Sequence, residues 1–498
     1  MLFRQKRDYY CWLKSDVVTN MKVLFIEPPK DYWFIMGEYR PPPFGILCLA
    51  AYLEAHLEDA EISVVDCQAE RLQWDGLEDR ITTFKPDMVC PGALSTVNTY
   101  LVARTVQLAK KVNPDITTVV GGLHFSVLAQ ESLEAYPEID FVVRGEGENT
   151  LLELVKTLES GQPLKQVNGL NYRHQGKVVQ TPDRTHIKDL DSLPYPGYHF
   201  VRDHMKHYHF TMMAGKKNPY ALIEASRGCN HKCSFCTQWQ YWGRCRRKSP
   251  KRVADEFEYV YREFGSRFLW LTDDNLGLGK WMDQFCDELL NRGITDDLLW
   301  FMQIRADDII KHQDLLPKMH QTGLHWAMSG VETYDASRLD NYRKGLDPSM
   351  AKQAMDLLKA NNIMSQTTAI IGDRNDTHES IEAFRKWLDD VNPDIAIFMI
   401  LTPYPGTELY ETAKREGWIE DENWFHYDMV HAVMPTEHLS RREVQKELYK
   451  CYRNFFGSWR RRIGGLFSTN RIKRSCYRYM MKQGVVLILK DLYEILRP

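Results

Sequence analysis

Short apolar segments alternate with amphipathic ones along most of the chain, and this pattern predicts two α/β regions. In the first region, continuous apolar stretches typical of buried strands lie at 22–29, 61–66, 87–93, 116–122 and 140–148. Segments with helical apolar spacing lie between them, at 44–57, 98–112 and 126–135. Buried strands separated by helices predict a parallel, doubly wound (Rossmann-like) sheet over residues 21–160.

The second region repeats the alternation about six times and predicts a partial (β/α)6 barrel of the TIM type over residues 216–412. Its expected strands are 220–226, 268–274, 299–305, 325–332, 365–372 and 394–405. We expect residues 161–215 to be a linker, residues 413–498 to be a mainly helical and basic C-terminal region, and residues 1–20 to be an N-terminal extension. The fold class is therefore α/β.

Parallel sheets bind ligands at the carboxyl ends of their strands. In the first region these ends carry three groups of small or polar residues: Ser95, Thr96 and Asn98; Gly121, Gly122 and His124; Gly145 and Glu146. The glycines are equally consistent with tight turns that bind nothing. A ligand site at this edge is thus an expectation that needs a second signal.

Charge and composition exclude some classes of function. The chain has 498 residues and a formal net charge of −3, which argues against bulk electrostatic binding of nucleic acid. No apolar run approaches the roughly 18 residues of a membrane helix, and the first twenty residues lack the apolar core of a signal peptide. Eight of the 11 cysteines are scattered, as expected for buried thiols in a reducing cytoplasm.

The other three cysteines, Cys229, Cys233 and Cys236, lie within one short loop directly after the first strand of the second region. Cysteine thiolates hold iron–sulfur clusters, and three ligands on a four-iron cube leave one iron open. The alternative is a structural zinc site completed by His231 or by a remote cysteine. The close spacing of His231 and Cys233 makes the zinc geometry awkward.

The stretch "SRGCNHKCSFCTQ", with Phe235 before the last cysteine, resembles the signature of the radical S-adenosylmethionine (SAM) enzymes. The resemblance implies a [4Fe-4S] cluster on Cys229, Cys233 and Cys236, and SAM bound at the open iron. It makes Phe235, Asp274, Arg305 and Glu332 candidate SAM contacts; Asp274 lies in "LTDDN" and Glu332 ends "GVE". Each acid could instead be a helix cap or a salt-bridge partner.

A doubly wound domain before such a barrel resembles the cobalamin-binding subclass, as do "RPPPFGILCLAAYL", "VVGGLHFS" and "VVRGEGE". This resemblance implies that the residues at the first region's strand ends contact cobalamin. The chain lacks the D-x-H-x-x-G motif, since "DCQAER" offers Asp66 but no histidine two positions later. We therefore expect no histidine below the cobalt.

For the reaction, the subclass implies methylation of an unactivated carbon by a 5′-deoxyadenosyl radical and methylcobalamin. We expect the substrate to be a protein or peptide; relatives in methanogens modify a glutamine of methyl-coenzyme M reductase. The stretches "CSFCTQWQYW" and "RRRIGGL" also resemble the anaerobic magnesium-protoporphyrin IX monomethyl ester cyclase, which leaves ring closure as an alternative. A non-catalytic cobalamin sensor is a third possibility, disfavoured by the intact cysteine triplet. No catalytic base is assigned.

The remaining expectations concern partners. A low-potential electron donor such as ferredoxin or flavodoxin is implied, and the protein is expected in the cytoplasm without nucleic acid or a membrane span. Trp239, Tyr241 and Trp242 either line a substrate cavity or exclude water from the cluster. The tail carries a basic cluster that is either a solvated helix face or a docking surface for an acidic partner or membrane: Arg460, Arg461, Arg462, Arg471, Lys473 and Arg474.

Overall fold

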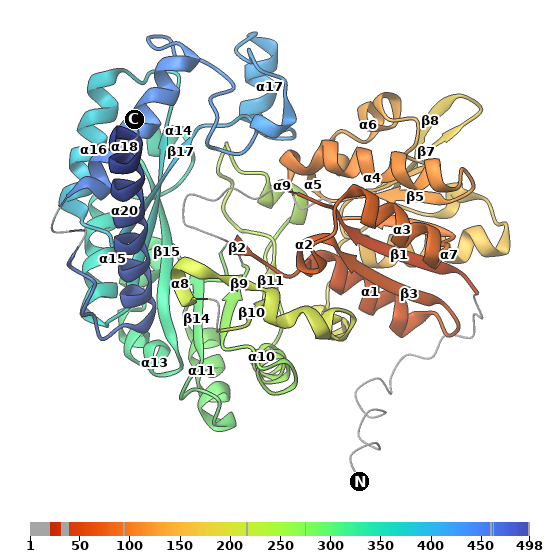
Figure 1. The fold of residues 1–498 in the computed structure, drawn as a ribbon, viewed down its shortest axis with the longest axis horizontal. Helices are drawn as coiled ribbons and strands as arrows, with labels where there is room; N and C mark the ends of the chain where they lie inside the picture. Colours follow the sequence, from red (N-terminus) through yellow and green to blue (C-terminus); the bar gives the residue numbers. More distant parts are fainter. Residues whose placement is uncertain are drawn as a thin grey trace.

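The structure is a computed structural model that describes residues 20–30, 39–92, 95–215, 218–273, 275–458, 461 and 463–496. The first domain and the barrel lie side by side, and the C-terminal region packs along the barrel (Figure 1). Both the doubly wound sheet and the partial barrel expected from the sequence are present. The predicted α/β fold class is confirmed.

The first domain is built on a seven-stranded sheet of order β3-β1-β4-β5-β6-β7-β8. Its first five strands in this order are parallel. The strands are β1 (Lys22–Glu27), β3 (Glu61–Asp66), β4 (Met88–Pro91), β5 (Thr117–Val120), β6 (Phe141–Val143), β7 (Leu170–His174) and β8 (Lys177–Gln180). The chain reverses its direction of travel across the sheet between β1 and β4, where such sheets form a ligand crevice.

Helices cover both faces of this sheet. They are α1 (Phe44–His56), α2 (Cys67–Glu70), α3 (Trp74–Phe84), α4 (Thr99–Val112), α5 (Leu123–Val127), α6 (Ala129–Ala135) and α7 (Gly147–Ser160), with the short helix η2 (Thr96–Asn98) before α4. The parallel strands are apolar on both faces because both faces are buried.

The stretch expected as a linker contributes structure to both sides. Strands β7 and β8 form an antiparallel hairpin that extends the first sheet. Further along, η5 (Tyr198–His207), β9 (His209–Phe210) and α8 (Thr211–Ala214) lead to the barrel. Strand β9 pairs with β2 (Tyr39–Arg40), so the connection is joined to the first domain a second time. The domain boundaries drawn from the sequence stay a prediction.

The barrel is an open sheet of six parallel strands in sequence order. They are β10 (Tyr220–Ile223), β13 (Phe268–Leu271), β14 (Leu299–Gln303), β15 (Leu324–Glu332), β16 (Met364–Ile371) and β17 (Ile395–Ile400). The covering helices are α10 (Pro250–Phe264), α11 (Lys280–Arg292), α12 (Ala306–Lys311), α13 (Leu316–Gln321), α14 (Ala336–Asn341), α15 (Ser349–Ala360) and α16 (His378–Val391).

Local sequence fixes these helices, as α10 illustrates. The Ser249 hydroxyl accepts a hydrogen bond from the backbone N–H of Arg252 (3.2 Å) and caps the helix. Pro250 occupies the first turn, where its missing N–H is not needed. Gly265, with a φ of +67°, ends the helix in the left-handed conformation.

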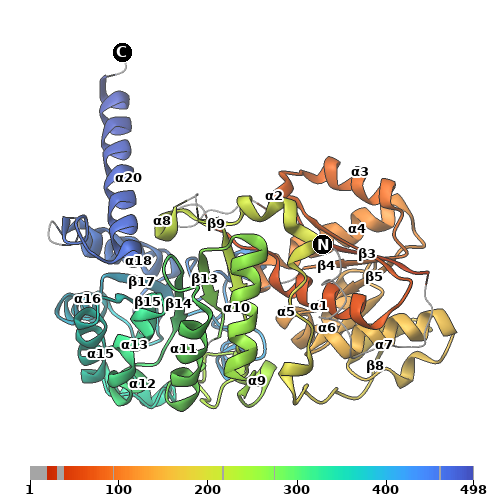
Figure 2. The same ribbon diagram turned by 90° about the horizontal axis from the view of Figure 1, so that it is seen from below.

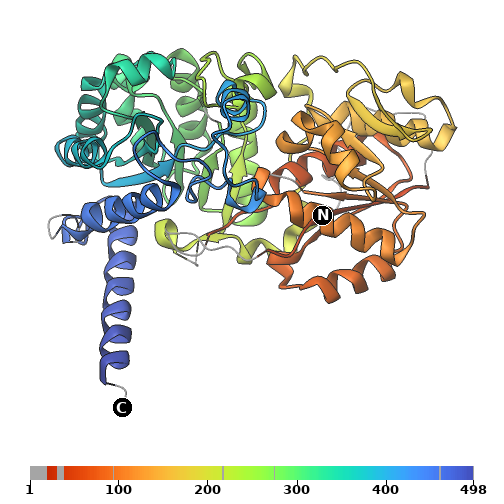
Figure 3. The same cartoon turned by 90° about the horizontal axis from the view of Figure 1, so that it is seen from above.

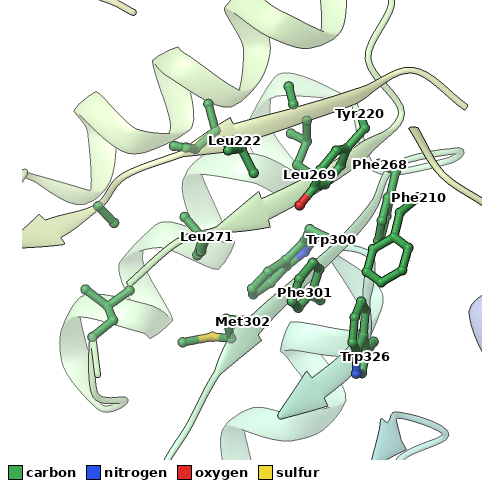
Figure 4. Close-up of a cluster of buried hydrophobic side chains, with 14 of the residues drawn as sticks. Phe210, Tyr220, Leu222, Phe268, Leu269, Leu271, Trp300, Phe301, Met302 and Trp326 are labelled. Atoms are coloured by element: carbon green, nitrogen blue, oxygen red, sulfur yellow. The ribbon is translucent and has the colours of Figure 1, made fainter. Parts of the chain in front are cut away.

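Aromatic side chains fill the barrel at the amino-terminal part of its strands (Figure 4). Phe301 stacks on Trp326 with ring centroids 3.9 Å apart, and Tyr220 stacks on Phe268 at 5.3 Å. Phe210 from β9 closes this cluster from outside the barrel sheet, packing edge-on against Trp326. Because this part is filled, a ligand cannot enter the barrel through the amino-terminal ends of the strands.

The C-terminal region contains α17 (Glu408–Arg415), η7 (Trp424–His426), α18 (Arg441–Gly457) and α20 (Arg471–Leu496). Helix α18 packs on β17 and α16. Helix α20 starts against the barrel and extends away from the body of the molecule (Figures 2 and 3). Over the described part of the chain, no helix has the length and apolar character to cross a bilayer.

Two described residues of the predicted basic cluster are tied to the barrel, whereas Arg471 is exposed and Arg474 donates to the carbonyl of Ser468 within the tail. Arg461 donates to the backbone carbonyl of Pro393 (2.6 Å) and packs over the ring of Phe455, while Lys473 pairs with Asp394 at 2.5 Å. Arg460 and Arg462 lie outside the described residues. The tail therefore stabilises the barrel through these contacts, and its role in docking stays a prediction.

Candidate active site

The cysteine loop follows β10 and is closed at its base. Strand β11 (Ser226–Arg227) pairs with β12 (Arg246–Arg247), and the backbone N–H of Cys229 donates to the carbonyl of Gly243 (3.1 Å). Gly228 between them has a φ of +88°, and a Cβ there would lie 2.5 Å from the Gly243 oxygen. Only glycine fits this close backbone approach.

The three cysteines expected to hold a cluster all lie in the loop between β11 and β12. Cys233 is buried, whereas Cys229 and Cys236 are partly exposed. Burial raises the pKa of the Cys233 thiol, and the Lys344 and Arg305 cations oppose this rise. Thiolates on one loop beside cationic groups fit the donor chemistry of an iron–sulfur cluster.

In the described residues, no three His, Cys, Asp or Glu side chains converge as a ready set of metal ligands. This holds for the cysteine triplet and for the alternative set with His231. The assignment of Cys229, Cys233 and Cys236 as cluster ligands therefore stays a prediction, which rests on loop position and donor chemistry.

A second segment, residues 341–344, forms a support for the cysteine loop. Ser234 donates from its backbone N–H to the carbonyl of Tyr342 (3.1 Å) and from its hydroxyl to that of Asn341 (3.2 Å). The ring of Phe235 packs edge-on against Tyr342 at 5.1 Å. Phe235 is thus held by the barrel, in a position where its neighbouring cysteines face the end of β15.

At the end of β15, Glu332 and Lys344 form a buried pair beside the cysteines. Their Oε1 and Nζ atoms are 2.6 Å apart, and the hydroxyl of Thr368 donates to Glu332 Oε2 (3.1 Å). Burial lowers the pKa of Lys344, but the charge of Glu332 outweighs it, so the net pKa is raised. Gly330 is required here, because a Cβ would lie 2.2 Å from Glu332 Oε1.

Arg305 adds a second cation beside the pair of Glu332 and Lys344, and it is itself paired with the carboxylate of Asp307. Its guanidinium donates two hydrogen bonds to Asp307 (both 3.0 Å) and one to the carbonyl of Lys344 (3.0 Å). The methionine part of SAM carries an ammonium and a carboxylate, so these charges are complementary to it. Glu332 and Arg305 were expected from the sequence, whereas Lys344 was missed because it lies in a loop without a recognised motif.

The other candidate SAM contact, Asp274, lies outside the described residues. Its neighbour Asp273 accepts hydrogen bonds from the backbone N–H of Ala225 (3.0 Å) and the hydroxyl of Ser226 (2.5 Å). Burial raises the pKa of Asp273 to about 7, against the opposing effect of these hydrogen bonds. Asp273 therefore braces β13 against the start of the cysteine loop.

A cavity of about 530 Å³ lies between the two domains. It is lined by the carboxyl ends of β1, β4, β5 and β6 on one side and of β10, β13 and β14 on the other. Two buried polar atoms on its wall, Gln238 Oε1 and Trp270 Nε1, have no hydrogen-bond partner. At Gly45 and Gly145 an added Cβ would meet nothing within 4 Å.

These features fit a large ligand with many amide groups, such as cobalamin. Unpartnered donors and acceptors can pair with peripheral amides, and bare glycine backbone allows close approach. Of the residues that the structure describes, no histidine lines the cavity. The fit is therefore to a cobalamin without a histidine ligand from this wall.

The predicted cobalamin contacts divide into two groups. Gly121, Gly122 and Gly145 line the cavity, whereas the remaining five lie outside its lining: Ser95, Thr96, Asn98, His124 and Glu146. The Ser95 hydroxyl donates to Asn98 Oδ1 (3.1 Å). The position of a residue just after a strand does not by itself show whether the residue lines the cavity. All eight assignments stay predictions.

His124 is buried against other rings. Its ring packs edge-on against Trp424 at 4.9 Å and Phe125 at 5.4 Å. Burial lowers the pKa of His124 to about 4, so the imidazole is neutral at pH 7. His124 therefore packs between the first domain and η7.

The three aromatic residues after the cysteines have separate positions. Trp239 donates its indole N–H to the carbonyl of Cys233 (3.0 Å) and braces the loop. Tyr241 donates its hydroxyl to the carbonyl of Gly145 (2.7 Å) and so joins the two domains. Tyr241 and Trp242 line the cavity.

Comparison with known proteins agrees with this architecture. Residues 36–155 match the model of the B12 binding domain, and residues 223–388 match that of the Radical SAM superfamily. An anaerobic magnesium-protoporphyrin IX monomethyl ester cyclase from Rubrivivax gelatinosus is 34% identical over 445 residues, which cover 88% of this chain and 77% of that protein. The chain belongs to the cobalamin-dependent radical SAM enzymes.

Two further comparisons support the family. An uncharacterized methyltransferase from Pyrococcus horikoshii is 30% identical over 443 residues, covering 88% of this chain and 92% of that protein. The solved structure of the cobalamin-dependent SAM radical enzyme OxsB, with aqua-cobalamin and SAM bound, shares the fold with a TM-score of 0.69. That alignment has 17% identity and covers 95% of this chain and 75% of OxsB.

Family membership confirms two predictions made from the sequence. The protein is an enzyme of the cobalamin-dependent radical SAM family, whose relatives include a cyclase and a methyltransferase. Its cofactors are a [4Fe-4S] cluster, SAM and cobalamin.

The cysteine assignment predicts the iron content of the protein. Replacing Cys229, Cys233 and Cys236 together with Ala removes the thiolates and should leave fewer than one iron per chain after anaerobic reconstitution, against about four in the wild type. A matched triple replacement of the scattered Cys48, Cys90 and Cys286 should keep the iron. A four-iron cluster in the first variant would rule out the assignment.

Loss of Lys344 should destabilise the protein. Lys344→Met leaves the Glu332 carboxylate buried without its counter-charge, which typically costs about 3–5 kcal/mol, and should also weaken SAM binding at least tenfold. The neighbouring Arg343→Met breaks a half-exposed pair with Glu408 and should cost at most about 1 kcal/mol. Denaturant unfolding and SAM titration measure both; equal effects would contradict the pairing described here.

Asp273 should make stability depend on pH. Its folded-state pKa of about 7 lies above the ordinary value, so its contribution is fully present below about pH 4 and is lost as the pH rises through 7. In Asp273→Asn, the fall in unfolding free energy between pH 4 and 8 should be smaller than in the wild type by about 3–4 kcal/mol. The exposed Asp59→Asn should keep the wild-type profile, and an unchanged profile in Asp273→Asn would refute the assignment.

Proposed function

We propose that this enzyme transfers a methyl group to an unactivated carbon of its substrate. The observation that carries the proposal is the single cavity shared by the carboxyl ends of both sheets. Two cofactors can act on the same substrate carbon only if both reach the same enclosed space. In this family, cobalamin supplies the methyl group, and SAM with the cluster supplies the radical that removes a hydrogen atom.

The chain's own residues bind and orient the cofactors and the substrate, and they exclude water from the cavity. The aromatic cluster around Phe301 and Trp326 closes the barrel below the cavity, and Tyr241 and Trp242 cover the side next to the cysteine loop. A dry site protects a reactive radical from side reactions. No side chain is assigned as a catalytic base, because the proposed transfer does not require one.

The cobalamin is proposed to lack a histidine below the cobalt. The support is the absent sequence motif together with the cavity wall, where no histidine occurs among the described lining residues. His124, the histidine expected in this region, packs under Trp424 instead.

Electron paramagnetic resonance of the cob(II)alamin form tests this directly. We expect no nitrogen hyperfine splitting from a protein ligand, and the same spectrum in His124→Phe as in the wild type. Nitrogen splitting that disappears in His124→Phe would show that His124 is a ligand and would overturn the proposal.

The substrate class is the finer part of the proposal. A carbon in a protein or peptide, such as a glutamine of methyl-coenzyme M reductase, stays our prediction; its support is the six-stranded barrel, whose sheet is open between β10 and β17. In the tail, Lys473 and Arg461 are paired with the barrel and give this substrate class no support. Arg471 is exposed, and docking of a partner there stays a prediction. A low-potential donor such as ferredoxin or flavodoxin is proposed as the reductant.

Ring closure of a magnesium porphyrin is the second candidate. The 34% identity to the cyclase of Rubrivivax gelatinosus favours it, and the aromatic wall of the cavity could stack on a flat macrocycle. A cobalamin sensor without catalysis has no such support, because a sensor does not need a loop of three cysteines beside charges that complement SAM.

Labelled SAM separates these functions. Anaerobic lysate of the source organism, supplied with SAM that carries a deuterated methyl group, should yield label on a peptide carbon with the wild-type enzyme but not with Cys229→Ala. Label on a small molecule would support methyl transfer and contradict the peptide substrate. A magnesium porphyrin that gains a fifth ring, with no labelled product, would overturn methyl transfer in favour of the cyclase.

A further inference from the structure

A buried ionic group joins the barrel to the first domain. Arg227, in β11 at the base of the cysteine loop, donates to Glu224 (2.7 Å) within the barrel and to Glu148 (2.7 Å) and Glu146 (3.2 Å) at the start of α7. The Arg227 side chain is 4% exposed, and those of Glu146 and Glu148 are 3% and 6% exposed. Arg246 adds a second cation, 2.8 Å from Glu146.

Burial makes this group sensitive to the relative position of the two domains. A carboxylate removed from water is stable only while its hydrogen-bonded counter-charge stays in place. The planar guanidinium reaches three carboxylates at once because its donors point in fixed directions. A small displacement of α7 from β11 would therefore leave buried carboxylates without partners.

The group lies between the two cofactor-binding parts. Arg227 precedes Gly228 and Cys229, the first of the predicted cluster ligands. Glu148 and Glu146 belong to the first domain, directly after Gly145 on the cavity wall. The guanidinium also lies 5.3 Å from the ring centroid of Trp242, so the end of the loop is held by the same side chain.

We propose that Arg227 is a positioning residue that fixes the distance and orientation between the cysteine loop and the cobalamin-facing edge of the first sheet. The proposal rests on the proposed function only in that both cofactors act on one substrate. Bimolecular steps inside an enzyme are sensitive to placement, and a misplacement of about 1 Å can cost about a hundredfold in rate. Arg227 itself lines the cavity, and the role proposed for it is to act through the loop and α7.

The test uses the full chain, reconstituted anaerobically with cluster and cobalamin. Pulsed electron paramagnetic resonance of the reduced cluster and cob(II)alamin gives the distribution of distances between them. In Arg227→Gln we expect wild-type iron and cobalamin contents, a broader or longer distance distribution, and a ten- to hundredfold fall in methylated product per SAM cleaved.

The chain offers a matched control in Arg292. This arginine is also largely buried, at 11% exposed, and also contacts three carboxylates, Asp255, Glu258 and Glu288. All four residues belong to α10 and α11 of the barrel, so Arg292→Gln breaks a similar group within one domain. It should leave both the distance distribution and the product ratio unchanged.

Two further variants keep the test decisive if Arg227→Gln does not fold. Glu148→Gln removes one carboxylate from the first domain and leaves Arg227 with Glu146 and Glu224, so it should broaden the distribution less than Arg227→Gln. Arg227→Lys keeps the positive charge but loses the planar guanidinium that reaches several carboxylates at once. Its distance distribution should lie between those of the wild type and Arg227→Gln. A wild-type distribution in all three variants, or equal broadening in Arg292→Gln, would overturn the proposal.

The distance measurement needs no substrate. If the wild-type enzyme methylates nothing, the proposed function fails, but the change in distance between Arg227→Gln and the wild type still decides the role of Arg227. A normal distance distribution with a normal product ratio in Arg227→Gln would refute the positioning role and leave the proposed function intact.

Discussion

The structure depends on one constraint: two parallel sheets must present their carboxyl ends to the same space. Helices cover both faces of the first sheet, whereas the barrel sheet is covered by helices outside and by aromatic side chains inside. The strand ends are therefore where backbone and polar side chains remain accessible. The cavity of about 530 Å³ lies where these two edges meet. The loops after β10, β13, β5 and β6 then serve one site, although they come from domains that are far apart in the sequence.

Contacts across the cavity maintain this arrangement. The hydrogen bond from Tyr241 to the carbonyl of Gly145 and the ion pairs of Arg227 both reach from the cysteine loop to the start of α7. The ribbon of β2 and β9 adds a connection at the opposite end of the barrel, where Phe210 contacts Trp326. The domains are thus joined at both ends of the barrel.

Sequence periodicity was sufficient for the elements that are regular. Both sheets were predicted because apolar runs of four to six residues alternate with amphipathic segments, a pattern set by burial on both faces. The hairpin β7–β8 was taken for a linker, since its edge strand β8 is polar at Lys177 and Gln180 and exposed at both. With four residues, of which the first and the last are polar, β8 has no apolar run long enough to reveal it.

The site was predictable only where a motif carries the chemistry. The cysteine loop has such a motif, and the expected residues Gly121, Gly122 and Gly145 line the cavity, while their contact with cobalamin stays a prediction. Glu146 was expected at cobalamin, yet its carboxylate accepts bonds from Arg227, Arg246 and the backbone of Ile187. Sequence cannot distinguish a ligand contact from an ion pair whose partner is eighty or more positions away.

The packing of η7 on the first domain has a consequence for how the protein is made. Trp424 lies on His124, and its backbone N–H is 3.4 Å from the hydroxyl of Tyr100, so the last third of the chain covers a surface formed by the first. Domains generally fold in the order in which the ribosome releases them. The first sheet is complete long before residue 424 emerges, so the surface that η7 covers is exposed to water while the barrel is synthesised. His124 and Tyr100 therefore reach their final surroundings only after the barrel has been made.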